Sequence, residues 1–141
     1  MEVDPATLVA ALGDAVVVAD PEGRIRLWNP AAERLFGYPA AEALGQSLDL
    51  IIPERFRARH WAGYREVMRT GHTRYGTEVL RVPAVRRDGA RLSIAFTVAL
   101  LRAPDGRITG IAAVIRDETA RWAEDQALRR RVAELERTQA P

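Results

Sequence analysis

Residues 28–38 read WNPAAERLFGY and carry the start and stop signals of one short helix. Asn29 can cap the first turn with its side chain, and Pro30 suits the first helical position. Gly37 suits the position after the last turn, where a left-handed backbone is common. The residues between these signals give the helix one apolar side: Ala31, Ala32, Leu35 and Phe36. We therefore predict a short helix from Pro30 to Phe36.

A β-hairpin is predicted directly before this helix. Residues 15–19 read AVVVA, and a β-branched run of this kind favours a strand. The next residues, DPEG at 20–23, are typical of a tight turn. Residues 24–28 then alternate polar and apolar side chains, as a half-buried strand does.

The second half of the sequence predicts one longer helix and three strands. The helix is expected from Glu54 to Thr70, because Gly71 follows it. Turn signals separate the three apolar runs after it, which are Thr77–Val85, Arg91–Leu100 and Ile108–Ile115. Pro83 indicates an edge strand or a bulge in the first run. Two strands, then helices, then three strands indicate an α+β fold with an antiparallel sheet.

The composition fits one globular domain. The chain has 141 residues, of which 48% are hydrophobic and 28% are charged. Its net charge is +2, and its arginines are dispersed apart from a run at 129–131, so we do not expect a nucleic-acid partner. The absence of cysteine excludes disulfides, thiolate metal sites and cysteinyl chromophores. No apolar run is long enough to enter a membrane and the start is no signal peptide, so we expect a cytoplasmic location.

The last segment, from Thr119 to about Arg137, has no Gly or Pro and reads as a helix. Leu128, Val132 and Leu135 repeat at four–three spacing, which defines a short a/d seam. Two interpretations are open: an amphipathic helix packed on its own domain, or a coiled coil that joins two chains in a homodimer. The spacing and the outward course of the helix favour the homodimer.

In its motifs and their order, the chain resembles the PAS family of sensory domains from about Leu8 to Arg121. The motifs that carry the resemblance are an opening hairpin at 19–25, the signature helix at 28–38, landmarks at 44–45 and 52–54, a late hairpin at 86–89 and an exit motif at 116–119. The resemblance implies a five-stranded antiparallel sheet with short helices on one face and a C-terminal helix.

The same resemblance implies a division into a sensor domain, residues 1–118, and a C-terminal signalling helix, residues 119–141. It implies sensing rather than catalysis, so we expect no enzyme activity. An effector such as a histidine kinase or cyclase domain, fused or separate, would receive the signal. Asp117 and Thr119 lie at the sheet-to-helix junction and are the candidates for passing the signal on.

Residues 54–64, ERFRARHWAGY, look similar to the long helix of haem-binding PAS domains in bacterial gas sensors. By this resemblance His60 is the candidate ligand of the iron of haem b, because neutral imidazole is a good iron ligand. Ile94, Phe96 and Val98 share one strand face and would line the pocket. His72 could meet a haem propionate together with Arg69 or Arg74.

Oxygen-sensing kinases of this family use an arginine on the strand before the late hairpin. Counting back from that turn reaches Leu80, with Arg81 next to it, and one residue of slip reverses the face of a strand. A bulge at Pro83 would bring Arg81 into the pocket. Two other functions stay open: the domain could bind an apolar organic ligand, or no ligand while it relays a signal between paired chains.

Overall fold

Five strands form one antiparallel sheet in the computed structural model, which describes residues 1–139. The strands are β1 (Ala15–Ala19), β2 (Ile25–Trp28), β3 (Leu80–Val85), β4 (Arg91–Arg102) and β5 (Ile108–Asp117). Their order across the sheet is β2-β1-β5-β4-β3, so the apolar β5 is central, as its sequence predicts. The predicted α+β fold is confirmed.

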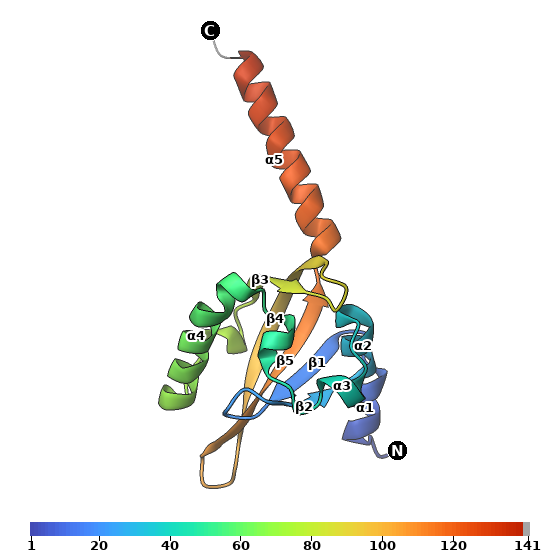
Figure 1. Cartoon of the computed structure of the whole chain (residues 1–141), viewed down its shortest axis with the longest axis vertical. Coiled ribbons are helices and arrows are strands. Elements are labelled where there is room, and N and C mark those ends of the chain that lie inside the picture. The colour runs from blue at the N-terminus through green and yellow to red at the C-terminus, as the bar shows by residue number, and fades with distance from the viewer. Residues whose placement is uncertain (140–141) are drawn as a thin grey trace.

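One face of the sheet, here called the inner face, is covered by the segment between β2 and β3 (Figure 1). The helices are α1 (Pro5–Ala11), α2 (Pro30–Phe36), α3 (Ala40–Ala43), α4 (Arg57–Thr70) and α5 (Thr119–Gln139). Three short 3-10 helices complete the chain: η1 (Leu48–Ile51), η2 (Glu54–Phe56) and η3 (Arg74–Gly76). The core joins apolar side chains of α2 and η1 to the inner-face residues of all five strands.

The structure differs from the sequence prediction around α4, around β3 and at the N-terminus. Residues 54–56 form a 3-10 turn, so α4 begins at Arg57. Strand β3 begins at Leu80 rather than Thr77, because the preceding residues form η3, whose start is capped by the Thr73 hydroxyl. The N-terminal helix α1 was not predicted, and it buries none of its residues.

The side chain of Asn29 joins four parts of the fold. It is 4% exposed, and its Oδ1 accepts hydrogen bonds from Val16 N at 2.8 Å and Ala32 N at 3.0 Å. Its Nδ2 donates to Val9 O at 3.0 Å and Asp14 O at 3.1 Å. The predicted N-cap of α2 is therefore confirmed, and the same amide also holds the end of α1 and the start of β1.

Helix α5 leaves the domain at the end of β5 and extends away from it (Figure 1). None of its residues from Thr119 to Gln139 is buried. The interpretation that this helix packs on its own domain is therefore wrong. The expected signalling helix also included Ala140 and Pro141, which lie outside the described residues.

The junction between β5 and α5 is tied to β4 by hydrogen bonds. Ser93 N donates to the Thr119 hydroxyl at 3.1 Å, and Glu118 N donates to Ser93 O at 2.8 Å. Asp117 Oδ1 accepts from Thr119 N at 2.9 Å, which caps the helix.

No helix within residues 1–139 combines the length and apolar character that crossing a membrane would require.

We predict that Asn29→Ala lowers the free energy of unfolding by roughly 2–4 kcal/mol. Loss of an N-cap costs about 1 kcal/mol, and a buried N–H left without a partner costs about 1–3 kcal/mol more. Urea unfolding followed by circular dichroism would measure the change. Thr73→Ala removes a cap at a less buried site and should cost about 1 kcal/mol or less; equal losses in the two variants would contradict the prediction.

Candidate functional site

Helix α4 presents one face to the domain. Arg57, His60, Trp61, Tyr64 and Met68 follow the three–four spacing of such a face, and each is at least half-buried. Of the fourteen residues of α4, all within the described part of the chain, Tyr64 alone is fully buried. His60 therefore lies on the inward side of a helix that covers the sheet loosely.

The imidazole of His60 packs against two aromatic side chains. Its ring centroid is 4.6 Å from that of Trp61, edge to face, and 5.7 Å from that of Tyr64. Its Nδ1 is buried and has no hydrogen-bond partner among the described residues. Burial lowers the pKa of His60, and the nearby charge of Asp49 opposes this only in part. The ring is consequently neutral near pH 7, which is the form that binds a metal.

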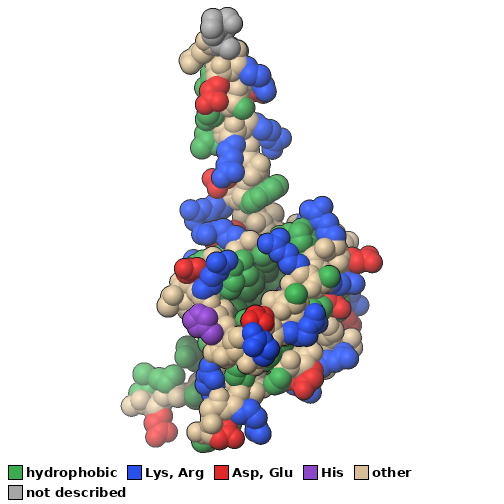
Figure 2. Space-filling view, turned by 90° about the vertical axis from the view of Figure 1, so that its left-hand side faces the viewer, with side chains coloured by type: hydrophobic (Ala, Val, Ile, Leu, Met, Phe, Trp, Pro, Cys, Tyr) green, Lys and Arg blue, Asp and Glu red, His purple; other side chains and the backbone are tan. Residues whose placement is uncertain are grey.

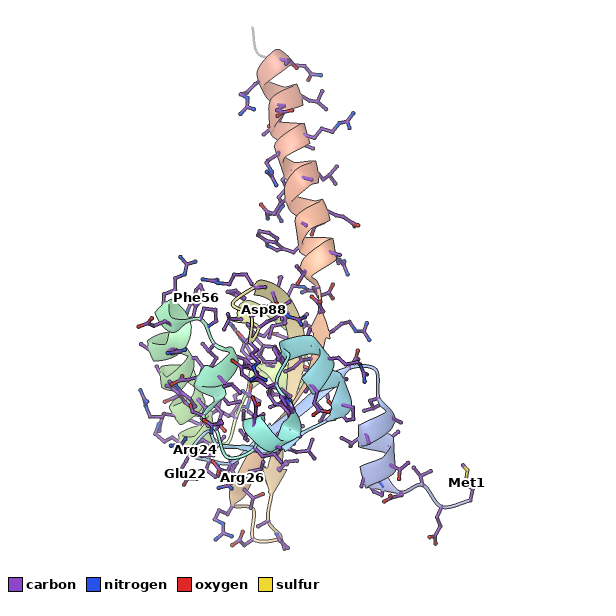
Figure 3. All side chains as sticks on the ribbon, turned by 45° about the vertical axis from the view of Figure 1, so that its right-hand side comes forward. Met1, Glu22, Arg24, Arg26, Phe56 and Asp88 are labelled. Atoms are coloured by element: carbon purple, nitrogen blue, oxygen red, sulfur yellow. The ribbon has the colours of Figure 1, made fainter. Side chains whose placement is uncertain are left out.

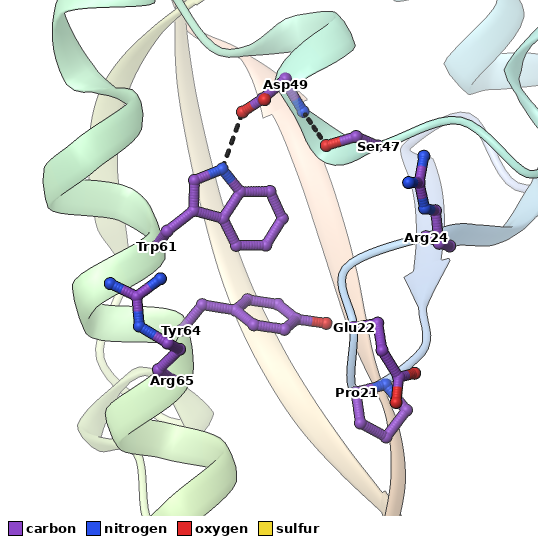
Figure 4. Close-up of a pocket in the computed structure, with 8 residues that line it drawn as sticks. All are labelled: Pro21, Glu22, Arg24, Ser47, Asp49, Trp61, Tyr64 and Arg65. Carbon is purple, nitrogen blue, oxygen red and sulfur yellow. Dashed lines mark hydrogen bonds between the residues drawn. The ribbon is translucent and has the colours of Figure 1, made fainter.

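Two hydrogen bonds fasten α4 beside His60. Trp61 Nε1 donates to Asp49 Oδ1 at 2.8 Å (Figure 4), and the Tyr64 hydroxyl donates to Asp20 O at 2.5 Å. At the end of the helix, Arg102 donates to Gly71 O at 2.6 Å. Nothing in the sequence indicates these three contacts, although the aromatic spacing on α4 does predict an inward face.

Trp61 also lies directly on the turn between β1 and β2. Gly23 has φ 83°, and a Cβ atom there would overlap the indole ring of Trp61. Asp20 closes this turn by accepting from Glu22 N and Arg24 N, while Glu22, Arg24 and Arg26 cluster at the end of the sheet remote from α5 (Figure 3). Helix α4 thus packs through Trp61 on a hydrogen-bonded turn.

A surface cleft of about 440 Å³ lies where α4, η1 and this turn meet. It is lined by Pro21, Glu22, Arg24, Ser47, Asp49, Trp61, Tyr64 and Arg65 (Figure 4). Charges of both signs line the cleft, which therefore differs in character from the apolar inner face of the sheet.

The inner face opposite α4 is apolar and incompletely covered. Ile94 is buried, whereas Phe96, Val98 and Leu80 are only half-buried. On the side of the molecule that carries α4, a hollow with a hydrophobic floor is bordered by basic side chains (Figure 2). Phe96 and Ile94 share this face because side chains alternate along β4.

The register of β3 resolves the choice between Leu80 and Arg81. Leu80 pairs with Phe96 and Arg81 pairs with Ala95, and the pairing continues without a bulge through Pro83 to Val85. Directly paired residues lie on the same face, so Leu80 is on the inner face and Arg81 is exposed on the outer face. The prediction that Arg81 lines the pocket is wrong; Pro83 marks the sheet edge instead.

His72 does not join the cluster around His60. It is exposed in the loop after Gly71, and its backbone N–H donates to the Thr70 hydroxyl at 3.3 Å. Arg69 and Arg74 are exposed on either side of this loop. The structure therefore brings His60 together with Trp61, Tyr64 and Asp49, and leaves His72 with the basic side chains outside.

Comparison with known proteins agrees with this architecture. The family model of the PAS fold matches residues 4–117. This chain belongs to the PAS family. A solved structure titled as an RNA-binding light-oxygen-voltage receptor superposes on the PAS domain with a TM-score of 0.76 at 27% identity, covering 91% of this chain and 36% of that one.

Two curated relatives of this PAS domain are sensors. Sensor protein FixL of Bradyrhizobium diazoefficiens is 31% identical over 131 residues, which are 92% of this chain and 25% of FixL. Oxygen sensor protein DosP of Escherichia coli K12 is 24% identical over 125 residues, or 89% of this chain and 15% of DosP. The chain thus spans a quarter or less of their length, and other relatives are histidine kinases. It is a sensory PAS domain related to those of histidine kinases.

The residues around His60 fit a haem. Haem requires one protein ligand and a dry, flat space, rather than a cluster of several ligands. His60 offers a neutral ring whose buried Nδ1 has no partner among the described residues. Phe96, Val98 and Leu80 offer an apolar wall whose partial exposure a flat apolar group would cover.

We predict that Gly23→Ala destabilises the domain more than Gly45→Ala. Both glycines have a left-handed backbone, φ 83° and 86°, so both variants lose about 1–2 kcal/mol from strain. Gly45 has open space around it, whereas the Cβ added at Gly23 would clash with Trp61 and should cost roughly 1–3 kcal/mol more. Urea unfolding of the two variants measures the difference; equal losses would show that the Trp61 contact is absent.

Proposed function

We propose that this PAS domain binds haem b through His60 and senses a gas or a redox change. It is proposed to relay that signal through α5 to an effector and to catalyse no reaction of its own. The observation that carries the proposal is the neutral imidazole of His60, held on the inward face of α4 with a buried Nδ1 that has no partner among the described residues. The resemblance of residues 54–64 to haem-binding PAS domains points the same way.

When bound, haem would supply an iron that binds a diatomic gas or changes its oxidation state. His60 would hold the iron, and Phe96 and Val98 would exclude water from the opposite side. Arg69 and Arg74 are exposed beside the loop at the end of α4 and would attract the propionates, because basic donors suit carboxylates. The outer-face position of Arg81 means that a gas-binding arginine would have to come from elsewhere.

The effector is proposed to be a histidine kinase or cyclase domain, fused or separate, in the cytoplasm. Histidine kinases occur among the relatives, and each relative is several times longer than this chain. The oxygen-sensing role that the name of DosP states supports a gas as the signal. Hemin titration and mass spectrometry together distinguish haem binding from the two alternatives, in which the domain binds an apolar organic ligand or no ligand.

Hemin titration of purified protein, followed by visible absorption, tests the ligand. We expect a Soret band at saturation in the wild-type protein and in His72→Ala, and loss of most of that band in His60→Ala. The reason is that, of the two histidines, His60 lies on the inward face of α4 and His72 is exposed. A wild-type protein that ignores hemin would refute the haem proposal. Mass spectrometry of molecules that copurify would then separate an organic ligand from a ligand-free relay.

Helix α5 is proposed to join two chains through the a/d seam. Leu128 is 62% exposed, Val132 46% and Leu135 54%, so each apolar side chain of the seam lies in water in the single chain. Burying them against a second copy would contribute roughly 25 cal/mol per Å² of apolar area removed from water. Asp117 and Thr119, bonded to each other and through Thr119 to β4, would carry movement of the sheet into this helix.

We predict that replacing both Leu128 and Leu135 with Glu converts a dimer into a monomer. Like charges would face each other at the seam, which is unfavourable by several kcal/mol across an interface. Sedimentation velocity measures the state. Ala127→Glu adds a single carboxylate beside the seam and should leave the dimer intact. A double variant that still dimerises would show that the contact lies elsewhere.

A further inference from the structure

The orientation of the His60 ring depends on few contacts. Helix α4 has one fully buried residue, Tyr64, and no hydrogen bond to His60 Nδ1 exists among the described residues. What surrounds the ring is aromatic: Trp61 on one side and Tyr64 on another. The position of the histidine is therefore only as well defined as the positions of those two side chains. Its importance for a ligand rests on the function proposed above.

Trp61 is held by four contacts. Its ring meets His60 edge to face at 4.6 Å and Tyr64 at 5.2 Å. On the other side it covers Gly23, where no Cβ atom would fit. Its one polar atom, Nε1, donates to Asp49 Oδ1 at 2.8 Å (Figure 4). The three packing contacts set where the indole lies, and the hydrogen bond sets its rotation about the side-chain axis.

Asp49 is held in place by its own element. It lies in η1, whose start is capped by the Ser47 hydroxyl, which accepts from Asp49 N at 3.1 Å. Arg57, at the start of α4, donates to Ile52 O at 3.0 Å and to Asp49 O at 3.3 Å. The backbone of Asp49 therefore belongs to a unit that connects η1 to the first turn of α4. Its carboxylate also lies 3.9 Å from Arg57 Nε, besides accepting from Trp61.

Asp49 does not bond to His60 itself. Its carboxylate is near enough to raise the pKa of His60 against the larger effect of burial. Its hydrogen bond goes instead to Trp61, the neighbour of His60 in sequence and in space. The carboxylate thus acts on the histidine through the indole as well as through its charge.

We propose that Asp49 is a positioning residue, which holds Trp61 and thereby fixes the ring plane of His60 for its ligand. Partners of this kind, one step removed from a metal ligand, commonly change metal affinity about 10–100-fold when they are removed. Because the contact is indirect, an effect near the lower end, about tenfold, is expected here.

Four variants separate positioning from charge and from folding. Asp49→Ala and Trp61→Phe both break the hydrogen bond, and Trp61→Phe also removes the distal indole atoms that cover Gly23. Asp49→Asn removes the charge but keeps a carbonyl oxygen that can accept from Trp61 Nε1. Glu22→Ala removes a different carboxylate from the same cleft and is the matched control.

Hemin affinity and the iron–histidine vibration of the loaded protein are the first readouts. We expect Asp49→Ala and Trp61→Phe to weaken hemin binding about tenfold and to shift the vibration, since the ring plane of His60 is released. Asp49→Asn should restore both values, and Glu22→Ala should leave both unchanged. Wild-type behaviour in Asp49→Ala, or no rescue by Asp49→Asn, would overturn the proposal.

A readout without haem keeps this test apart from the proposed function. In the ligand-free protein, the indole N–H signal of Trp61 in a ¹H–¹⁵N spectrum should move in Asp49→Ala and stay in Asp49→Asn, and the ring signals of His60 should follow it. If wild-type protein takes up no hemin, these signals still decide whether Asp49 positions His60. Unmoved His60 signals in Asp49→Ala would overturn the positioning role in either case.

Discussion

The pairing of the first strand with the last organises this PAS domain. β1 and β5 are antiparallel neighbours from Ala15 opposite Ile115 to Ala19 opposite Ile111. This pairing places β2 at one edge of the sheet and β3 at the other. The segment from Asn29 to Val79 must therefore cross the whole sheet to connect them, and in crossing it covers the inner face. The helices lie on one face because of this connection, and the candidate site lies where their cover is thinnest.

Short-range patterns in the sequence were sufficient for the main elements. The cap at Asn29, the turn at 20–23 and the alternation along β4 each depend on residues close in the chain, and each is present in the structure. The helix α1 was missed for a related reason. It buries no residue, so it has no apolar stripe for a periodic pattern to reveal, and its cap position Asp4 forms no side-chain cap bond to its backbone.

Contacts between distant elements were beyond such patterns. The sequence placed His60 on a helix and its spacing put it on the inward face, but nothing nearby in the chain indicates that Asp49 receives the Trp61 N–H. The sequence also does not determine whether Leu80 or Arg81 lies on the inner face of β3, for a reason specific to strands. One residue reverses the face of a strand, and Pro83 is compatible with both an edge and a bulge. Only the continuous pairing from Leu80 to Val85 separates the two.

The candidate site and the exit helix are closer than their places in the chain indicate. Ser93 bonds to both Glu118 and Thr119 at the start of α5, and it lies on β4 between Leu92 and Ile94, whose side chains belong to the core under the inner face. Ser93 and Ile94 are consecutive residues, so a ligand that displaced Ile94 would act directly beside the residue that holds the first turn of α5. Helix α4, by contrast, meets the sheet through Tyr64 at Asp20 and through Gly71 at Arg102, both at the end remote from α5. The shorter path of contacts from the inner face to α5 therefore runs through β4 rather than through the helix that carries the histidine.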